Sequence, residues 1–420
     1  MSKELKLKDG SVVAIIGGGP SGTSCAINLK KESIRMGIDL KIVLFEGKDF
    51  DYLYNQCVGV LSPPFERILT NELGVEFPSH LIKRRIEGYV LYGNGNKIFL
   101  NGNENEGSTY AVRRIEFDNF MLDTVRRLGV DVRKNRTTYV EFIEDEVRIF
   151  GERGYLKADV VVGAFGLDES MLGVFEKATK DSAGYKRPKR LLRSYITKIF
   201  ASDDFIDRKL GNYIYAFIPR TLPNVEFGAV TPKKGHIMVN VAGRNVHSTD
   251  LIEFLKLSRV MELLPPSEES GEPDYFEGMF PASTSQNPFG DRFVMVGDAT
   301  GWLRPFKGKG INTACITGIK AAETMLKKGI SKSDFEQYAI QCQPLTDDYV
   351  YGSIARNITH IFSGIGIFDK LIDVARYDKK LYDGFYNAVS GHDSYKNIFK
   401  EIITPKTIFN ITKGFIFSLI

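Results

Sequence analysis

Two glycine-rich segments, far apart in this 420-residue chain, constrain its fold more than any other feature. The first, GGGPSG at residues 17–22, directly follows an apolar run and precedes a helical pattern. The second, GDATGWLRPFKGKGINTA at residues 297–314, also connects an apolar run to a helical pattern. A glycine loop between a strand and a helix is typical of sites that bind phosphates at a helix N-terminus. We therefore expect the two segments to meet around one long ligand.

The first segment matches the G-x-G-x-x-G pattern of dinucleotide-binding folds, in the strand–loop–helix context that this pattern requires. Its glycines predict a tight turn, close approach to a pyrophosphate and close helix–strand packing. Glu46 ends the next apolar run, where a carboxylate binds ribose hydroxyls and repels the 2′-phosphate of NADP. FAD and NAD remain equal on this motif, and a glycine-rich turn without a ligand is the alternative. The predicted cofactor contacts are Gly17, Gly19, Pro20, Ser21, Gly22 and Glu46.

The second segment favours FAD, because a long two-part cofactor requires a second binding site. Asp298 follows an apolar run, where its carboxylate can accept hydrogen bonds from a ribityl chain; a helix-capping aspartate is the alternative. The helix predicted over 311–325 points its N-terminus into the same crevice, where it would stabilise negative charge on a reduced flavin. Lys309 either offsets that charge or points to solvent. The predicted contacts here are Gly297, Asp298, Pro305, Gly308, Lys309, Gly310, Ile311 and Asn312.

The hydrophobic pattern along the chain predicts an α/β fold with a discontinuous cofactor domain. Apolar runs at 12–16 and 40–45 flank a helix over 21–36, which indicates a Rossmann-like FAD-binding domain of the glutathione-reductase type. Residues 191–245 are instead typical of strands with polar alternation. We expect FAD-binding parts at 1–78, 113–180 and 289–330, an inserted antiparallel-sheet substrate domain at 79–112 and 181–288, and a helical C-terminal region at 331–420.

Three segments resemble a known family. The second glycine segment resembles the GD-A-x-G-x-x-x-P-x-x-G-x-G-I-x-x-A signature of FAD-dependent oxidoreductases that include geranylgeranyl reductases, p-hydroxybenzoate-hydroxylase-type monooxygenases and flavin-dependent halogenases. RIEFD at 114–118 is similar to that family's R-x-x-F-D segment, which implies that Arg114, or its neighbour Arg113, approaches the flavin side chain or pyrophosphate. CVGVLSP at 57–63 resembles the C-G-G-x-x-S-P segment of the geranylgeranyl reductase branch, with Val58 replacing a glycine.

The resemblance also implies residues near the reacting centre. Cys57 is expected to face the flavin as a proton donor or substrate contact, or to be a small buried residue in a turn. Phe165 stands where the hydroxylases carry an acid associated with pyridine-nucleotide handling. YIYAFIP at 213–219 is similar to the reductases' Y-x-W-x-F-P element, and the halogenases' W-x-W-x-I-P element is absent. The substrate contacts implied are Tyr213, Tyr215 and Phe217, together with Trp302, for which packing is the alternative.

Composition narrows the partners and the location. The net charge of +4 is mild and gives no case for a nucleic-acid partner, which would require a concentrated basic stripe. The four cysteines and five histidines show no metal-ligand spacing, which predicts a reduced cytoplasmic protein without a metal site. The apolar C-terminal segment, IFKEIITPKTIFNITKGFIFSLI, could lie at the inner face of a membrane, cap a substrate tunnel or pack onto the core.

Taken with the resemblance, these patterns predict an FAD-dependent enzyme that reduces C=C bonds of an isoprenoid or other apolar, lipid-like substrate. The implied partners are that substrate and an external electron donor, which could be ferredoxin, quinol or NAD(P)H. Two alternatives remain: a monooxygenase of the aromatic-hydroxylase type, and a membrane-peripheral flavoprotein that turns over no substrate.

Overall fold

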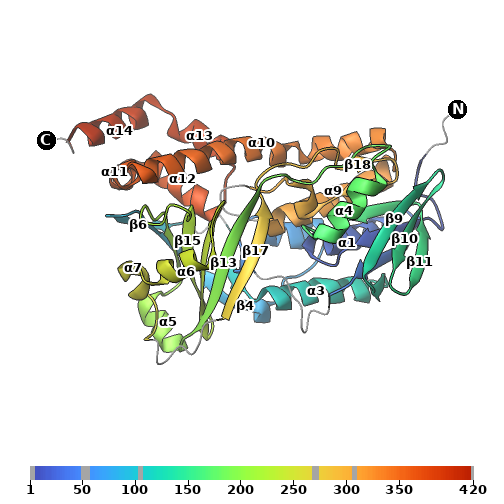
Figure 1. Cartoon of the computed structure of the whole chain (residues 1–420), viewed down its shortest axis with the longest axis horizontal. Helices are drawn as coiled ribbons and strands as arrows, with labels where there is room; N and C mark the ends of the chain where they lie inside the picture. Colours follow the sequence, from blue (N-terminus) through green and yellow to red (C-terminus); the bar gives the residue numbers. More distant parts are fainter. Residues whose placement is uncertain (1–4, 49–56, 103–106, 267–273, 305–309, 418–420) are drawn as a thin grey trace.

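The computed structural model describes residues 5–48, 57–102, 107–266, 274–304 and 310–417 (Figure 1). A six-stranded sheet with its helices lies at one end of the molecule, and a seven-stranded sheet lies at the other (Figure 1). The long helix α10, Lys332–Gly364, runs along the top of both parts (Figure 1). The molecule is therefore built from two sheets that share one layer of C-terminal helices.

The six-stranded sheet has the order β18-β19-β12-β1-β2-β8, and all its pairs are parallel except β18–β19. Its central strand β1 is apolar throughout, as expected of a parallel strand that is covered on both faces. The βαβ beginning predicted from the sequence is confirmed. The strands are β1 Val12–Ile16, β2 Lys41–Glu46, β8 Asp131–Lys134, β12 Val160–Gly163, β18 Phe289–Gly290 and β19 Phe293–Met295.

Helices α1, Pro20–Arg35, and α9, Gly310–Lys327, pack side by side on this sheet. A Cβ atom added at Gly318 of α9 would lie 2.3 Å from the carbonyl oxygen of Ser21, so only glycine permits this approach. Both helices start at the carboxyl ends of parallel strands, where such sheets bind ligands. Their close packing brings the two glycine-rich segments to one edge of the sheet.

Smaller elements complete this half of the molecule. One small antiparallel sheet has the order β11-β10-β9, and a second has the order β3-β7-β4. The elements are β3 Val60–Leu61, β4 Ile82–Ile86, β7 Thr109–Val112, β9 Thr137–Ile143, β10 Glu146–Gly151, β11 Gly154–Ala158, α2 Phe65–Arg67, α3 Arg114–Arg127 and α4 Glu169–Ala178.

The seven-stranded sheet has the order β17-β13-β16-β15-β14-β5-β6. The prediction of a purely antiparallel sheet is wrong for one pair, because β14 and β5 run parallel. The hairpin β5–β6 belongs to the segment 79–112. It pairs with β14, which lies more than a hundred residues later in the sequence. The strands are β5 Gly88–Tyr92, β6 Lys97–Asn101, β13 Leu191–Phe200, β14 Tyr213–Phe217, β15 Phe227–Lys233, β16 His236–Gly243 and β17 Asp274–Pro281.

Strand β16 departs from the expected polar alternation, since all eight of its residues are buried. It lies inside the sheet, and both of its faces are covered. One face packs against an apolar cluster that includes Phe254 of helix α6, and the other faces a cavity. The short helices of this half are α5 Asp203–Lys209, α6 Ser248–Leu255 and α7 Ser258–Met261.

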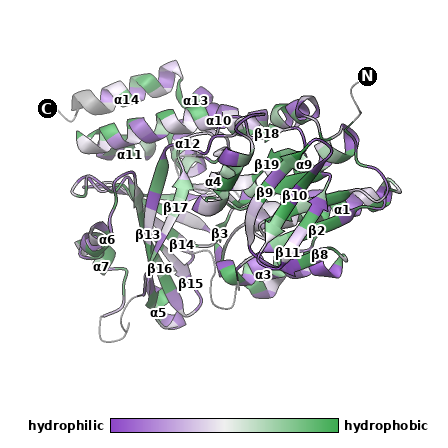
Figure 2. Cartoon of the chain, turned by 45° about the vertical axis from the view of Figure 1, so that its right-hand side comes forward, coloured by the Kyte–Doolittle hydropathy of each residue, from purple (hydrophilic) through white to green (hydrophobic). Residues whose placement is uncertain are grey.

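The C-terminal region is helical, as predicted. After α10 come α11 Ile367–Ala375, α12 Lys379–Ser390, α13 Tyr395–Ile402 and α14 Pro405–Phe417. Apolar and polar residues alternate along α11 and α14, which is typical of helices with one buried and one solvated face (Figure 2). None of the helices that the structure describes is both long enough and apolar enough to span a membrane.

Candidate active site

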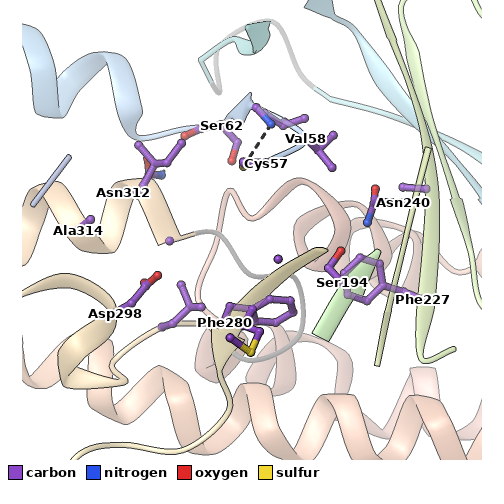
Figure 3. Close-up of a pocket in the computed structure, with 18 of the residues that line it drawn as sticks. Cys57, Val58, Ser62, Ser194, Phe227, Asn240, Phe280, Asp298, Asn312 and Ala314 are labelled. Atoms are coloured by element: carbon purple, nitrogen blue, oxygen red, sulfur yellow. Dashed lines mark hydrogen bonds between the residues drawn. The ribbon is translucent and has the colours of Figure 1, made fainter. Parts of the chain in front are cut away.

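One cavity of about 1370 Å³ extends through the molecule from the glycine-rich segments to the C-terminal helices. Its first part, here called the cradle, is lined by the loop after β1, the end of β2 and the turn after β19. Its middle is lined by the Cys57 segment and the face of the seven-stranded sheet (Figure 3). Its last part is lined by helices α10 to α14. The three regions therefore share one continuous space.

The backbone of the first glycine segment leaves room for a ligand at one position only. Gly17 has φ of +112°, and a Cβ there would lie 2.4 Å from Ala164 O. A Cβ at Gly22 would lie 1.9 Å from Gly17 O, so the helix and loop are in close contact there. A Cβ at Gly19 would meet nothing within 4 Å, and Gly19 lines the cavity. The open side of the loop thus faces the space that a pyrophosphate would need.

Helix α1 presents an uncapped N-terminus to this space. Its N-cap residue is Gly19, which offers no side-chain hydrogen bond, and Pro20 follows at the first helical position. The free backbone N–H groups of the first turn are donors that a phosphate oxygen can accept from. Pro20 and Ser21 both line the cavity, as the sequence predicted for cofactor contacts. The geometry suits an anionic group at this point.

Glu46 lines the cavity at the end of β2, and its carboxylate is held by two backbone donors. The N–H of Gly18 donates to Oε2 at 2.8 Å, and the N–H of Lys48 donates to Oε1 at 2.7 Å. Burial raises the pKa of Glu46, while the same two hydrogen bonds act to lower it. Each oxygen keeps a lone pair for a further donor, so the carboxylate can accept hydrogen bonds from ribose hydroxyls.

Asp298 lies at the opposite side of the cradle, in a short 3₁₀ turn after β19. The turn is fixed to α9, because the N–H of Gly297 donates to Thr317 Oγ1 at 2.9 Å. Among the residues that the structure describes, none donates a hydrogen bond to the Asp298 carboxylate. Burial raises the pKa of Asp298, and the nearby Arg114 acts to lower it. This carboxylate is directed at the cavity and has acceptor capacity for a ligand (Figure 3).

The structure distinguishes the two neighbouring arginines. Arg114 lines the cavity, and its Nε donates to Asp118 Oδ1 at 2.8 Å, an ion pair in which the aspartate side chain is fully buried. Arg113 is about half exposed, pairs with Glu116 at 3.3 Å and is not among the lining residues. Only Arg114 is therefore placed to contact a bound cofactor.

The Cys57 segment closes the cradle over the first turn of α9. Asn312 Nδ2 donates to Ser62 O at 2.9 Å, which ties the two segments together (Figure 3). Cys57 lines the cavity, and its Sγ accepts the N–H of Gly59 at 3.3 Å. Gly59 has φ of +71°, and a Cβ there would lie 2.3 Å from Val112 O. The glycine lets this segment lie against β7, and it thereby places the thiol at the cavity wall.

The remaining predicted cofactor contacts are divided. Gly310, Ile311 and Asn312 line the cavity at the start of α9, whereas Pro305, Gly308 and Lys309 lie outside the described residues. Trp302, predicted either to border the flavin or to pack, is buried in the core with its ring centroid 5.3 Å from that of Tyr338. The cavity lining includes its neighbour Leu303 instead.

The substrate contacts expected on β14 face away from the cavity. Phe217 stacks on Tyr92 with centroids 4.6 Å apart and packs against Phe254 on the far side of the sheet. Tyr213 and Tyr215 pack with the same cluster. Successive side chains of a strand point to opposite faces, so the alternate residues Ile214, Ala216 and Ile218 line the cavity. This corrects the expectation by one residue along the strand.

Several lining residues were not singled out in the sequence. They include Ser194 and Asn240 on the seven-stranded sheet, with Phe227 and Phe280 beside them (Figure 3). Thr231 of the same sheet also lines the cavity. Strand alternation was the only signal that could have found them, and it needed knowledge of which face is covered. The far end of the cavity is apolar and is lined by C-terminal side chains such as Ile358, Phe362, Phe385, Phe399, Ile402 and Ile411.

The chain is similar to several known proteins. A digeranylgeranylglycerophospholipid reductase of Methanococcus vannielii is 25% identical over 80% of this chain and 82% of its own length. The crystal structure of a geranylgeranyl bacteriochlorophyll reductase-like protein from Thermoplasma acidophilum matches with a TM-score of 0.73 and 18% identity, covering 94% and 99% of the two chains. No family model matches the chain.

A p-nitrophenol 4-monooxygenase from Pseudomonas putida also shares the fold, with a TM-score of 0.69 and 15% identity over 93% of this chain and 99% of its own. The chain thus shares the fold of these two structures. The named relatives confirm the resemblance to the geranylgeranyl reductase-like branch, and they confirm the expectation of an enzyme.

Proposed function

We propose that this protein is an FAD-dependent reductase of C=C bonds in an isoprenoid or similarly apolar, lipid-like substrate. The observation that carries the proposal is the single cavity that joins the nucleotide cradle to an apolar chamber under the C-terminal helices. A cradle alone would suit many dinucleotide enzymes. An apolar chamber that opens directly from it suits a substrate made largely of hydrocarbon.

Several lining residues support FAD as the cofactor. The open side of Gly19 and the uncapped start of α1 would receive the pyrophosphate, and Glu46 would accept the hydroxyls of the adenosine ribose. Asp298 has acceptor capacity at the place where a ribityl chain would run, and Arg114 would add positive charge beside it. When bound, the flavin supplies the hydride for reduction.

The chain's own residues would set the geometry and supply the proton. Reduction of a C=C bond adds one hydride and one proton, and the proton must come from a donor in the cavity. We assign it to the thiol of Cys57, with water as the alternative, because Cys57 lies between the cradle and the sheet wall (Figure 3). The hydrogen bond from Gly59 to Cys57 Sγ would stabilise the thiolate that remains.

The wall of the chamber would hold the substrate. Ile214, Ala216 and Ile218 provide an apolar surface on the sheet, and the helices α10 to α14 enclose the opposite side. We propose that residues 79–112 and 181–288 serve as the substrate domain, and that the C-terminal segment caps the chamber. Burial of a long prenyl chain here would exclude water from the reacting bond.

The electron donor is proposed to be an external partner, either ferredoxin, quinol or NAD(P)H. Phe165 lines the cavity in place of the acid that the hydroxylases carry, which favours donors other than a pyridine nucleotide. Stopped-flow reduction of the flavin by each donor class would rank them. Rapid reduction by NAD(P)H, followed by oxygen consumption with substrate, would support the monooxygenase alternative instead.

The direct test is anaerobic incubation of the chemically reduced holoprotein with polyprenyl lipids, followed by mass spectrometry. We expect a mass gain of two hydrogens for each reduced double bond. A variant in which Gly22→Ala removes flavin binding serves as the matched negative control. Flavin-loaded, reduced protein that leaves every prenyl lipid unchanged would contradict the proposal.

A further inference from the structure

The apolar wall of the seven-stranded sheet contains one polar patch, formed by Ser194, Thr231 and Asn240. All three line the cavity and come from the adjacent strands β13, β15 and β16. Ser194 and Asn240 are labelled in Figure 3. Asn240 pairs in register with Ile196 on one side and Ala229 on the other, and both of these neighbours also line the cavity. The patch therefore has apolar lining residues on both sides of Asn240.

The side chain of Asn240 is buried without a hydrogen-bond partner. Only 5% of the residue is exposed, yet no residue in the described part of the chain makes a hydrogen bond to its amide. Thr231 is 1% exposed, and its hydroxyl likewise has no partner among the described residues. Ser194 Oγ donates to Val241 O at 3.0 Å, which leaves the hydroxyl oxygen able to accept.

Such an arrangement becomes unfavourable once an apolar ligand fills the cavity. An amide that is then cut off from water without a partner costs roughly 1–3 kcal/mol. The neighbours of Asn240 on the same face of β16 are Met238 and Ala242, so an apolar side chain would suit the strand better. The polar atoms of Asn240 are accessible from the cavity, since neither of them is fully buried. A ligand in the cavity is the partner that the geometry leaves available.

The charges around the cavity indicate which kind of ligand group fits. The cations in the described lining are Lys48, Arg114 and Arg136, and all three belong to the nucleotide-binding half. The charged residue that the sheet contributes to the described lining is Glu277 of β17, which is an acid. A phosphate at the patch would thus find no compensating cation among the lining residues of the sheet, and the buried Lys233 of β15 already donates to Val112 O at 2.7 Å. A neutral carbonyl can accept a hydrogen bond from the amide of Asn240. A neutral hydroxyl can also donate one to that amide or to the neighbouring hydroxyls.

We propose that Asn240, with Thr231 and Ser194 beside it, binds a neutral oxygen group, such as a hydroxyl or carbonyl, on a mainly hydrocarbon substrate. This inference rests on the proposed function, because it requires an apolar substrate in this cavity. The contact would fix how far the substrate enters the chamber and hence which double bond lies next to the flavin. Asn240 is in this sense a specificity-determining residue.

The test compares two ligands of equal length on the flavin-loaded protein by calorimetry. One is a C20 prenyl alcohol, and the other is the same prenyl chain with hydrogen in place of the hydroxyl. The corresponding prenyl phosphate is titrated alongside them. We expect the wild-type protein to bind the alcohol roughly tenfold more tightly. Asn240→Leu keeps a similar volume and should abolish that preference. Met238→Leu, on the same strand but not among the lining residues, is the control and should leave the preference intact.

The outcomes separate this inference from the proposed function. A lost preference in Asn240→Leu supports the inference, even if no C=C bond is reduced in a parallel assay. Equal weakening of both ligands by Asn240→Leu would show a structural role and overturn it. Tighter binding of the prenyl phosphate than of the alcohol, unchanged in Asn240→Leu, would also overturn it. If the wild-type protein binds neither chain, both the inference and the substrate class fail.

Discussion

The two ends of the cavity are built by different means. At the nucleotide end, the backbone of two glycine loops and two carboxylates at strand ends form the walls. At the apolar end, side chains from five helices and from the seven-stranded sheet form them. The first end depends on residues that few substitutions can replace. The second depends on collective packing, in which many apolar side chains can exchange.

Gly22→Ala should have the largest effect, and it tests the nucleotide end of the cavity. The added Cβ would lie 1.9 Å from Gly17 O, so α1 would have to move away from the loop that we propose binds the pyrophosphate. We expect purified protein without flavin, seen as the loss of visible absorbance. Gly364→Ala, where a Cβ meets nothing within 4 Å, should retain the flavin. A fully yellow Gly22→Ala protein would contradict the assignment of the loop.

Cys57→Ala tests the junction between the two ends. If the thiol supplies the proton, turnover should fall roughly a hundredfold with little change in KM. Single-turnover kinetics under anaerobic conditions would measure the rate. An unchanged rate would assign the proton to water and leave Cys57 as a residue of the turn.

Ala216→Phe and Tyr215→Phe form a pair that tests which face of β14 meets the substrate. Ala216 lines the cavity, so a larger side chain should raise KM roughly tenfold or more without affecting the flavin. Tyr215 faces the other side, where its hydroxyl makes only long hydrogen bonds, at 3.3 Å to Lys209 O and 3.4 Å to Leu210 O. Its loss should leave KM unchanged. The reverse pattern would restore the original expectation for β14.

Asp298→Asn should weaken flavin binding roughly tenfold, because a charged acceptor is lost. It should also stabilise the flavin-free protein at neutral pH. Burial raises the pKa of Asp298, so the folded wild-type protein without flavin carries an unfavourable charge above that pKa. The difference in Tm should shrink as pH falls through this raised pKa, since the wild-type carboxyl then takes up a proton. Asp123→Asn, on the exposed surface of α3, is the control.

Trp302→Phe should have the smallest effect on function. Trp302 packs against Tyr338 in the core, so the substitution should lower the free energy of unfolding by about 1–2 kcal/mol. Neither KM nor flavin affinity should change. Thermal unfolding and steady-state kinetics would measure the two quantities. A selective rise in KM would place the indole next to the substrate instead of in the core.

The contrast between the two ends also explains what the sequence could predict. The positions of Gly17, Glu46 and Asp298 follow from local rules, because a strand, a turn and a helix determine them within a few residues. The structure places these residues where the motifs predicted, on one edge of the six-stranded sheet. The two glycine segments are far apart in the sequence, but the close packing of α1 and α9 brings them together in space.

The sheet wall could not be predicted in the same way. Its strands β14 and β16 are covered on both faces, so polarity does not reveal which face meets the cavity. The aromatic residues of β14 attracted attention, but they pack on the side away from the cavity. The parallel pairing of β14 with β5 depends on how a distant hairpin docks, and no local pattern encodes it. Asn240 was missed for the same reason.

The central claim is that the flavin cradle and the apolar chamber share one cavity. Its most direct test is a titration of the flavin-loaded protein with a C20 prenyl alcohol, followed through the visible spectrum of the bound flavin. The account predicts a saturable spectral change, abolished by Ala216→Phe, because the ligand would lie against the ring. Calorimetric binding of the alcohol without any change in the flavin spectrum would contradict it.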